Sequence, residues 1–176
     1  MNQITLKILN HIAKKQNSDI IEVFSVFLAN ITSGNEDFEK VALKIFDLNK
    51  LNDKEINLLK DFFDYLREDV DNDKNFKEKL CLFVEDYKKT ATDLASFFVI
   101  FLPKDVIFSK NPEKIKDSLS IYPKEIKEAI IKAIEFLSLL TTDIDNNTKK
   151  EIFQNIIEIM IILSGIMKVL GESNEI

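Results

Sequence analysis

The chain has 176 residues, of which 45% are hydrophobic and 31% charged, and 24 basic against 30 acidic side chains give a formal net charge of −6. This hydrophobic content excludes an intrinsically disordered chain, and three glycines and three prolines are too few for the many turns of an all-β fold. A single cysteine excludes an internal disulfide, and the negative charge, with Arg67 as the sole arginine, argues against nucleic-acid binding.

Apolar residues recur at alternating intervals of three and four along nearly the whole chain, as in Ile20, Phe24, Phe27 and Ile31. This spacing places them on one face of a helix. We therefore predict an all-α fold, in which residues 1–176 form one antiparallel helical bundle of seven to nine helices with a long apolar C-terminal helix. The expected helices cover residues 3–15, 19–32, 36–48, 53–69, 74–89, 92–102, 112–120, 123–141 and 148–170.

In the first half of the chain, polar residues and one glycine indicate where helices begin and end. Ser18 can cap the helix that begins at the next residue. Gly34 can end that helix in a left-handed conformation. Asn52, with Glu55 three residues later, resembles a capping box.

In the second half, residues 74–102 can form one long helix or two, because no strong breaker interrupts them. Residues 104–110 can form an extended connector. Pro112 and Pro123 stand at expected first helical positions, and Gly171 is expected to end the last helix.

Two acidic turns, residues 69–73 and 143–147, carry aspartate at alternate positions. An EF-hand calcium loop would add a glycine at its sixth position and a glutamate at its twelfth, and both turns lack them. Asp and Asn suit turns and helix caps, so we expect Asp73 or Asn75 to cap one following helix and Asn147 the other.

The segments around these turns resemble each other. Residues 54–75 and 124–147 both run from Lys-Glu-Ile through an apolar stretch to Asp-x-Asp-Asn. This is the pattern expected of a duplicated helical hairpin.

His11 is the only histidine and Cys81 the only cysteine. One histidine excludes His-rich metal sites, and its place beside an apolar stripe predicts a half-buried structural role. Cys81 lies between two leucines and is expected to pack in or near the core.

Two pairs of acidic residues at a spacing of three, Glu36 with Glu39 and Glu68 with Asp71, form the one pattern that suggests catalysis. This spacing puts both carboxylates of a pair on one helical face, where they can bind Mg²⁺. The pattern resembles the paired carboxylates of helical nucleotide pyrophosphohydrolases. These four residues are therefore the candidate metal ligands of an alternative, magnesium-dependent hydrolase.

The segment from Ile152 to Leu170 is apolar on almost every side. Such a helix is buried centrally, buried against a second subunit, or in contact with a membrane. Gln154 and other polar residues interrupt it, which disfavours a membrane span. The candidate interaction surface consists of apolar residues on this helix: Phe153, Ile157, Met160 and Met167.

Together these patterns favour a non-catalytic helical interaction or regulatory protein that binds a protein partner or a second copy of itself, without a cofactor. The lysines between Lys104 and Lys132 exceed the acidic residues there by two, which suits either an acidic partner or a solvated face. No N-terminal signal segment is visible, so we expect a cytoplasmic protein. The alternatives are the hydrolase above and a peripheral membrane protein attached through the last helix.

Overall fold

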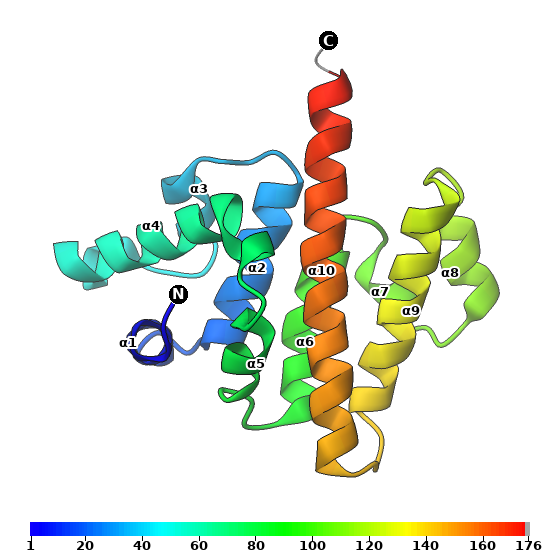
Figure 1. Cartoon of the computed structure of the whole chain (residues 1–176), viewed down its shortest axis with the longest axis horizontal. Helices are drawn as coiled ribbons and strands as arrows, with labels where there is room; N and C mark the ends of the chain where they lie inside the picture. Colours follow the sequence, from blue (N-terminus) through cyan, green and yellow to red (C-terminus); the bar gives the residue numbers. More distant parts are fainter. Residues whose placement is uncertain (175–176) are drawn as a thin grey trace.

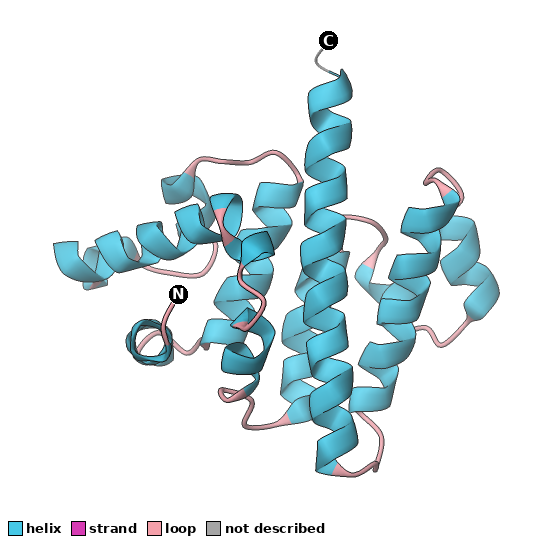
Figure 2. Cartoon of the chain, viewed as in Figure 1, coloured by secondary structure: helices cyan, strands magenta, loops and turns pink. Residues whose placement is uncertain are grey.

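The computed structural model describes residues 1–174, which form ten α-helices and two 3₁₀ helices, with no strand among them (Figure 2). The prediction of an all-α fold with a long C-terminal helix is confirmed. The α-helices are α1 (Gln3–Lys14), α2 (Ile20–Thr32), α3 (Phe38–Ala42), α4 (Asp53–Glu68), α5 (Phe76–Cys81), α6 (Tyr87–Phe98), α7 (Lys104–Ile107), α8 (Pro112–Ser118), α9 (Lys124–Leu140) and α10 (Asn146–Asn174), and the 3₁₀ helices are η1 (Leu48–Lys50) and η2 (Val70–Asn72).

The last helix, α10, runs through the middle of the molecule (Figure 1). It packs against α9 on one side and against α2 and α5 on the other, while α2 has its most extensive contact with α6. Helices α1 and α4 lie across these long helices (Figure 1). The fold is therefore a bundle in which two N-terminal helices cross the others.

Aromatic rings fill the core between α2, α3 and α4. The ring of Phe27 meets that of Phe63 edge to face at 5.5 Å between centroids, and lies 6.1 Å from Phe62 and 6.2 Å from Phe38. Phe27, Phe62 and Phe63 are fully buried. These contacts fix how α4 crosses α2, because tilted and edge-to-face ring pairs favour particular geometries.

Several predicted helix ends are confirmed. The side chain of Asn52 accepts a hydrogen bond from the Glu55 amide (2.9 Å), and the Glu55 side chain accepts one from the Asn52 amide (3.1 Å), which forms the capping box of α4. Gly34 has a φ of 86°. Pro112 opens α8, with Asn111 accepting a hydrogen bond from the Lys114 amide (3.3 Å).

Two expectations near the N-terminus were wrong. Asp19, one residue after the predicted cap Ser18, caps α2 by accepting a hydrogen bond from the Glu22 amide (2.9 Å). The helix expected over residues 36–48 ends at Ala42. The reason is tertiary, because the Gln16 side chain donates to the Asp47 carbonyl (3.1 Å) and accepts from the Asp47 amide (2.8 Å), which holds this backbone out of a helix.

The chain between residues 74 and 102 forms two helices, and the break is at residues 82–86. Asp86 caps α6 by accepting a hydrogen bond from the Lys88 amide (3.0 Å). Residues 104–107, expected to be extended, form the short helix α7.

The start of α9 and the end of α10 also differ from the predictions. Pro123 directly precedes α9 instead of opening it. Helix α10 continues through Gly171 to Asn174. The segments 54–75 and 124–147 each contain a long helix followed by a turn, but one turn leads to η2 and the other to α10, so the duplication stays a prediction.

Candidate functional site

The four carboxylates predicted to bind magnesium do not come together. Glu36 and Glu39 line an open hollow of about 620 Å³ with Arg67. Glu68 instead pairs with the Arg67 guanidinium (2.9 Å), and Asp71 lines a different hollow beside α10. They are separated because α4 ends at Glu68 and η2 then carries Asp71 toward α10.

Within residues 1–174, no three His, Cys, Asp or Glu side chains are placed to hold a metal ion. The prediction that these four carboxylates form one metal site is therefore wrong.

The prediction for the lone cysteine is confirmed, whereas the prediction for the lone histidine is wrong. His11 is exposed, which corrects the expected half-buried position. Cys81 is buried as expected, and burial raises the pKa of its thiol.

The first acidic turn holds the N-terminus in place. Asp73 accepts hydrogen bonds from the Tyr65 hydroxyl (2.7 Å) and from the Met1 ammonium (3.2 Å). Burial acts to raise the pKa of Asp73, but these two hydrogen bonds outweigh it, so the pKa is lowered. Of the two predicted caps of α5, the side chain of Asn75 makes no capping hydrogen bond, whereas Asp73 accepts one from the Asn75 amide (3.3 Å), at the residue before the helix.

The second acidic turn caps α10, but through a residue other than the predicted Asn147. Asp145 accepts hydrogen bonds from the amide (2.9 Å) and the hydroxyl (2.8 Å) of Thr148. Asn147 lies inside the first turn of the helix. Both acidic turns therefore have structural roles.

A cluster of three charged side chains between α2 and α6 was not anticipated. The Lys89 ammonium donates to the carboxylates of both Asp19 and Asp93, the latter at 3.1 Å. Burial, together with the nearby charge of Asp19, raises the pKa of Asp93 to about 7. Burial acts to raise the pKa of Asp19 as well, but hydrogen bonds from Lys89 and the Glu22 amide lower it.

The sequence holds a weak sign of this cluster. Lys89 and Asp93 are four residues apart on one helix, a spacing that favours an ion pair. Asp19, however, comes from another helix. Only the packing of α2 on α6 brings it to the other two.

Helix α10 has two apolar faces, and its core face contains most of the predicted interaction surface. Phe153, Ile157 and Met160 are fully buried, and Met167 lies half-buried on the same side about two turns beyond Met160. Three of the four residues assigned to an interaction surface therefore pack in the core of a single chain. Periodicity identified them as apolar but could not tell which apolar face the bundle would cover.

The other face of α10 points to solvent. It carries an exposed row at helical spacing, which we call the outer stripe and which consists of Ile162 (51% exposed), Ile166 (37%), Val169 (60%) and Leu170 (39%). The sequence contained the signal for this stripe, because the helix is apolar on almost every side.

Two hydrogen bonds join α10 to the rest of the bundle on the side of the helix that faces away from the outer stripe. Ser164 accepts a hydrogen bond from the Thr32 hydroxyl (2.8 Å), and Lys168 donates to the Arg67 carbonyl (3.0 Å). Lys168 lies on the opposite side of the helix from Ile166, at 200° along an ideal helix, so its charge is directed away from the stripe. The end of α10 extends beyond every other helix (Figure 1).

A hollow of about 400 Å³ adjoins the lower end of the outer stripe. Val70, Ile161 and Ile162 supply its apolar part, and Lys77 with Glu158, paired at 3.2 Å, forms part of its rim. Ile162 belongs to both the stripe and this hollow, and five of the eight residues that line the hollow are charged: Asp71, Asp73, Lys74, Lys77 and Glu158.

By length and composition, residues Asn146–Gly171 of α10 could cross a membrane, with a mean hydropathy of 1.7 over the most apolar window. One third of that window is buried inside the bundle. Core helices of soluble proteins have the same properties, so this observation alone does not assign a span.

Comparison of this chain with protein-family models, with curated proteins and with solved structures finds no match. Its function therefore has to be argued from its own residues.

Proposed function

We propose that this protein is a non-catalytic helical interaction protein that associates with a second copy of itself through the outer stripe of α10. The observation that carries the proposal is the exposed row of Ile162, Ile166, Val169 and Leu170 on a helix whose opposite face is already packed in the core. An apolar row on a projecting helix favours burial against another surface.

The stripe suits a second copy because it is self-complementary. Its residues follow the spacing by which two helices pack side by side, and a twofold axis near Ile166 would bring the same surface together from both copies. The nearest charge on this part of the helix, Lys168, is bound to the body and does not interrupt the contact.

An antiparallel arrangement uses more of the surface than a parallel one. A standard interface buries about 800 Å² on each partner, which is more than four side chains supply. In antiparallel pairing about Ile166, the tip of one copy at Leu170 meets Ile162 of the other copy and reaches its adjoining hollow. In parallel pairing the two tips meet and both hollows stay open.

The oligomeric state tests the proposal. We expect light scattering after gel filtration to give twice the chain mass of 20.4 kDa. Ile166→Glu should give the single-chain mass, because it buries a charge at the twofold axis. Ile121→Glu, at a more exposed apolar position outside the stripe, should stay dimeric.

Cysteine cross-linking tests the orientation, in a Cys81→Ser background. A mixture of Ile162→Cys and Leu170→Cys chains should form disulfide-linked dimers if the pairing is antiparallel. Either variant alone should link readily only if the pairing is parallel.

Peripheral attachment to a membrane is the competing use of the same stripe. Wild-type protein that stays monomeric at every concentration, and that floats with liposomes in a manner abolished by Ile166→Glu, would replace self-association with membrane binding. A monomer that does not float would refute any role for the stripe.

A further inference from the structure

A second apolar site lies outside the outer stripe, and no residue of the stripe lines it. It is a groove of about 380 Å³ between α7, α8 and α9. Its floor consists of buried aliphatic side chains, and we call it the α7–α9 groove. These side chains are Ile107, Ile115, Ile134 and Leu137.

The wall of the groove is apolar, as its floor is. Phe108, which is 43% exposed, and Ile131 add apolar surface to it. A cavity of this volume with this lining is within the range of small-molecule sites, which are mostly apolar with a few polar groups that orient the ligand.

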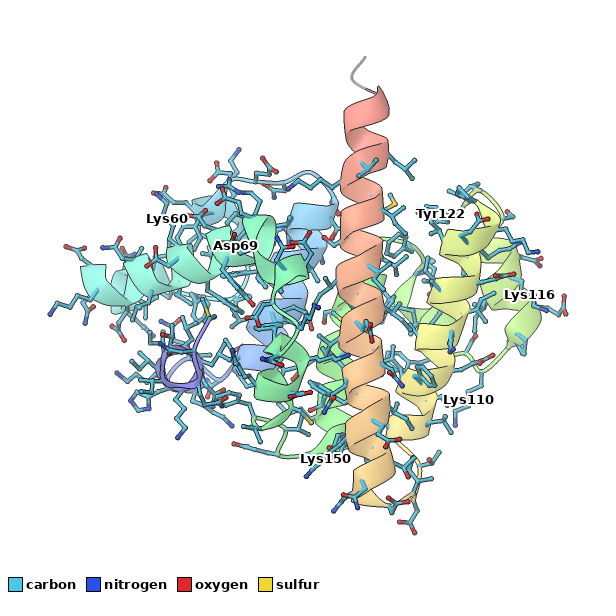
Figure 3. The ribbon with its side chains drawn as sticks, viewed as in Figure 1. Lys60, Asp69, Lys110, Lys116, Tyr122 and Lys150 are labelled. Atoms are coloured by element: carbon cyan, nitrogen blue, oxygen red, sulfur yellow. The ribbon has the colours of Figure 1, made fainter. Side chains whose placement is uncertain are left out.

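Two lysines stand at the rim on the α8 side. Lys110 precedes α8 and Lys116 lies within it, and both are exposed and line the groove (Figure 3). Among the described residues, neither ammonium forms a salt bridge with a carboxylate of the chain. Glu135, the one acidic residue of the lining, belongs to α9 on the other wall.

The backbone holds Lys110 in an unusual conformation. Its φ is 56°, in the left-handed region that non-glycine residues seldom occupy. Ser109 stabilises this turn, because its hydroxyl donates to the Val106 carbonyl (2.7 Å) and accepts from the Asn111 amide (3.3 Å). The backbone of Lys110 is therefore held at a defined place on the rim.

We propose that the α7–α9 groove binds a single-chain amphiphile with an anionic head group, such as a free fatty acid. The apolar chain would lie on the aliphatic floor, and the carboxylate would lie on the α8 side near Lys110 and Lys116, away from Glu135. The charge of the rim selects an anion, and the apolar lining selects an aliphatic body.

Dodecanoate is the probe, measured by isothermal titration calorimetry at submicellar concentration. We expect saturable binding of one molecule per chain. The double variant Lys110→Gln/Lys116→Gln should bind at least about tenfold more weakly, because the carboxylate loses both ammonium partners. Glu135→Gln should bind more tightly, and Lys54→Gln, an exposed lysine far along the chain, should bind as the wild type does.

The location is tested by Ser138→Trp, which fills the groove from an exposed position on α9. This variant should lose binding while keeping the helical circular dichroism of the wild type. Methyl NMR provides a measurement that needs no variant, because dodecanoate should shift the signals of Ile107, Ile115, Ile134 and Leu137.

Other outcomes would overturn the proposal. These are absence of dodecanoate binding, equal affinity of the wild type for dodecanoate and for neutral dodecanol, or methyl shifts confined to α10. Binding that persists in Ile166→Glu separates this site from the outer stripe, so the two proposals can fail independently.

Discussion

The buried carboxyl group of Asp93 shares its site with the Asp19 carboxylate and the Lys89 ammonium. One cation faces two carboxyl groups, so ionising both leaves the second negative charge without a counter-charge of its own. Burial and the charge of Asp19 therefore raise the pKa of Asp93 to about 7, above its ordinary value of 3.8.

This shift makes folding stability depend on pH. Between pH 3.8 and about 7 the folded chain keeps a proton on Asp93 that the unfolded chain releases. The folded state then binds more protons, so stability decreases as pH rises through this window and levels off above it.

We predict that the unfolding free energy falls by about 1–3 kcal/mol between pH 5 and pH 8, since one pKa unit corresponds to about 1.4 kcal/mol. Asp93→Asn should flatten this dependence and be more stable than the wild type at pH 8. Urea unfolding followed by circular dichroism at both pH values measures it. A wild type whose stability rises with pH over this range would contradict the prediction.

Single residues were the hardest to predict. The spacing of Lys89 and Asp93 is visible in the sequence, but the effect of Asp19 is not, because Asp19 lies 70 positions before Lys89 and reaches it only through packing. Similarly, Asp73 accepts a hydrogen bond from the Asn75 amide just before α5, as a predicted cap would, but its contact with the N-terminal ammonium of Met1 was not visible in the sequence.

At the scale of elements, some helix ends defined by neighbouring residues were predictable and others were not. The capping box of α4 involves only Asn52 and Glu55, three residues apart, and it formed as expected. The helix predicted over residues 36–48 failed, because Gln16, from a distant segment, binds the backbone of Asp47.

We predict that Asn52→Ala destabilises the protein by about 1 kcal/mol, because it leaves the Glu55 amide without its capping acceptor. Asn49→Ala, at a nearby exposed position outside α4, is the control and should change stability by less than about 0.5 kcal/mol. Thermal and urea unfolding give both values. Equal effects of the two variants would mean that the capping box does not contribute.

Helix α10 shows the limit of periodicity within one element. The sequence showed that this helix is apolar on almost every side, but the spacing of its apolar residues does not say which face packs against the bundle. The bundle covers Met160 and leaves Ile162 exposed, so the interaction surface that we propose lies on the second face.

At the scale of the whole molecule, the core depends on contacts between helices that are distant in sequence. Phe27 of α2 touches rings from α3 and α4, so it joins three elements at one point. Removing a ring at such a position leaves a cavity lined by side chains that cannot all collapse into it.

We predict that Phe27→Ala lowers the unfolding free energy by about 3–5 kcal/mol. Phe108→Ala removes the same atoms at a 43% exposed site and should cost about 1 kcal/mol or less. Urea denaturation compares the two variants, with the slope of the transition checked for two-state behaviour. A small loss at Phe27 would show that the surrounding rings repack.

The amino-acid sequence by itself determined the all-α class, the long apolar last helix and the capping box of α4, because all of these depend on residues within a turn or two of one another. The tertiary structure alone decided which face of α10 is covered, where Asp19 meets Lys89 and Asp93, and that the four acidic residues from Glu36 to Asp71 stay apart. These outcomes depend on how helices pack, and packing is set by the combined shapes of side chains that lie far apart in the sequence.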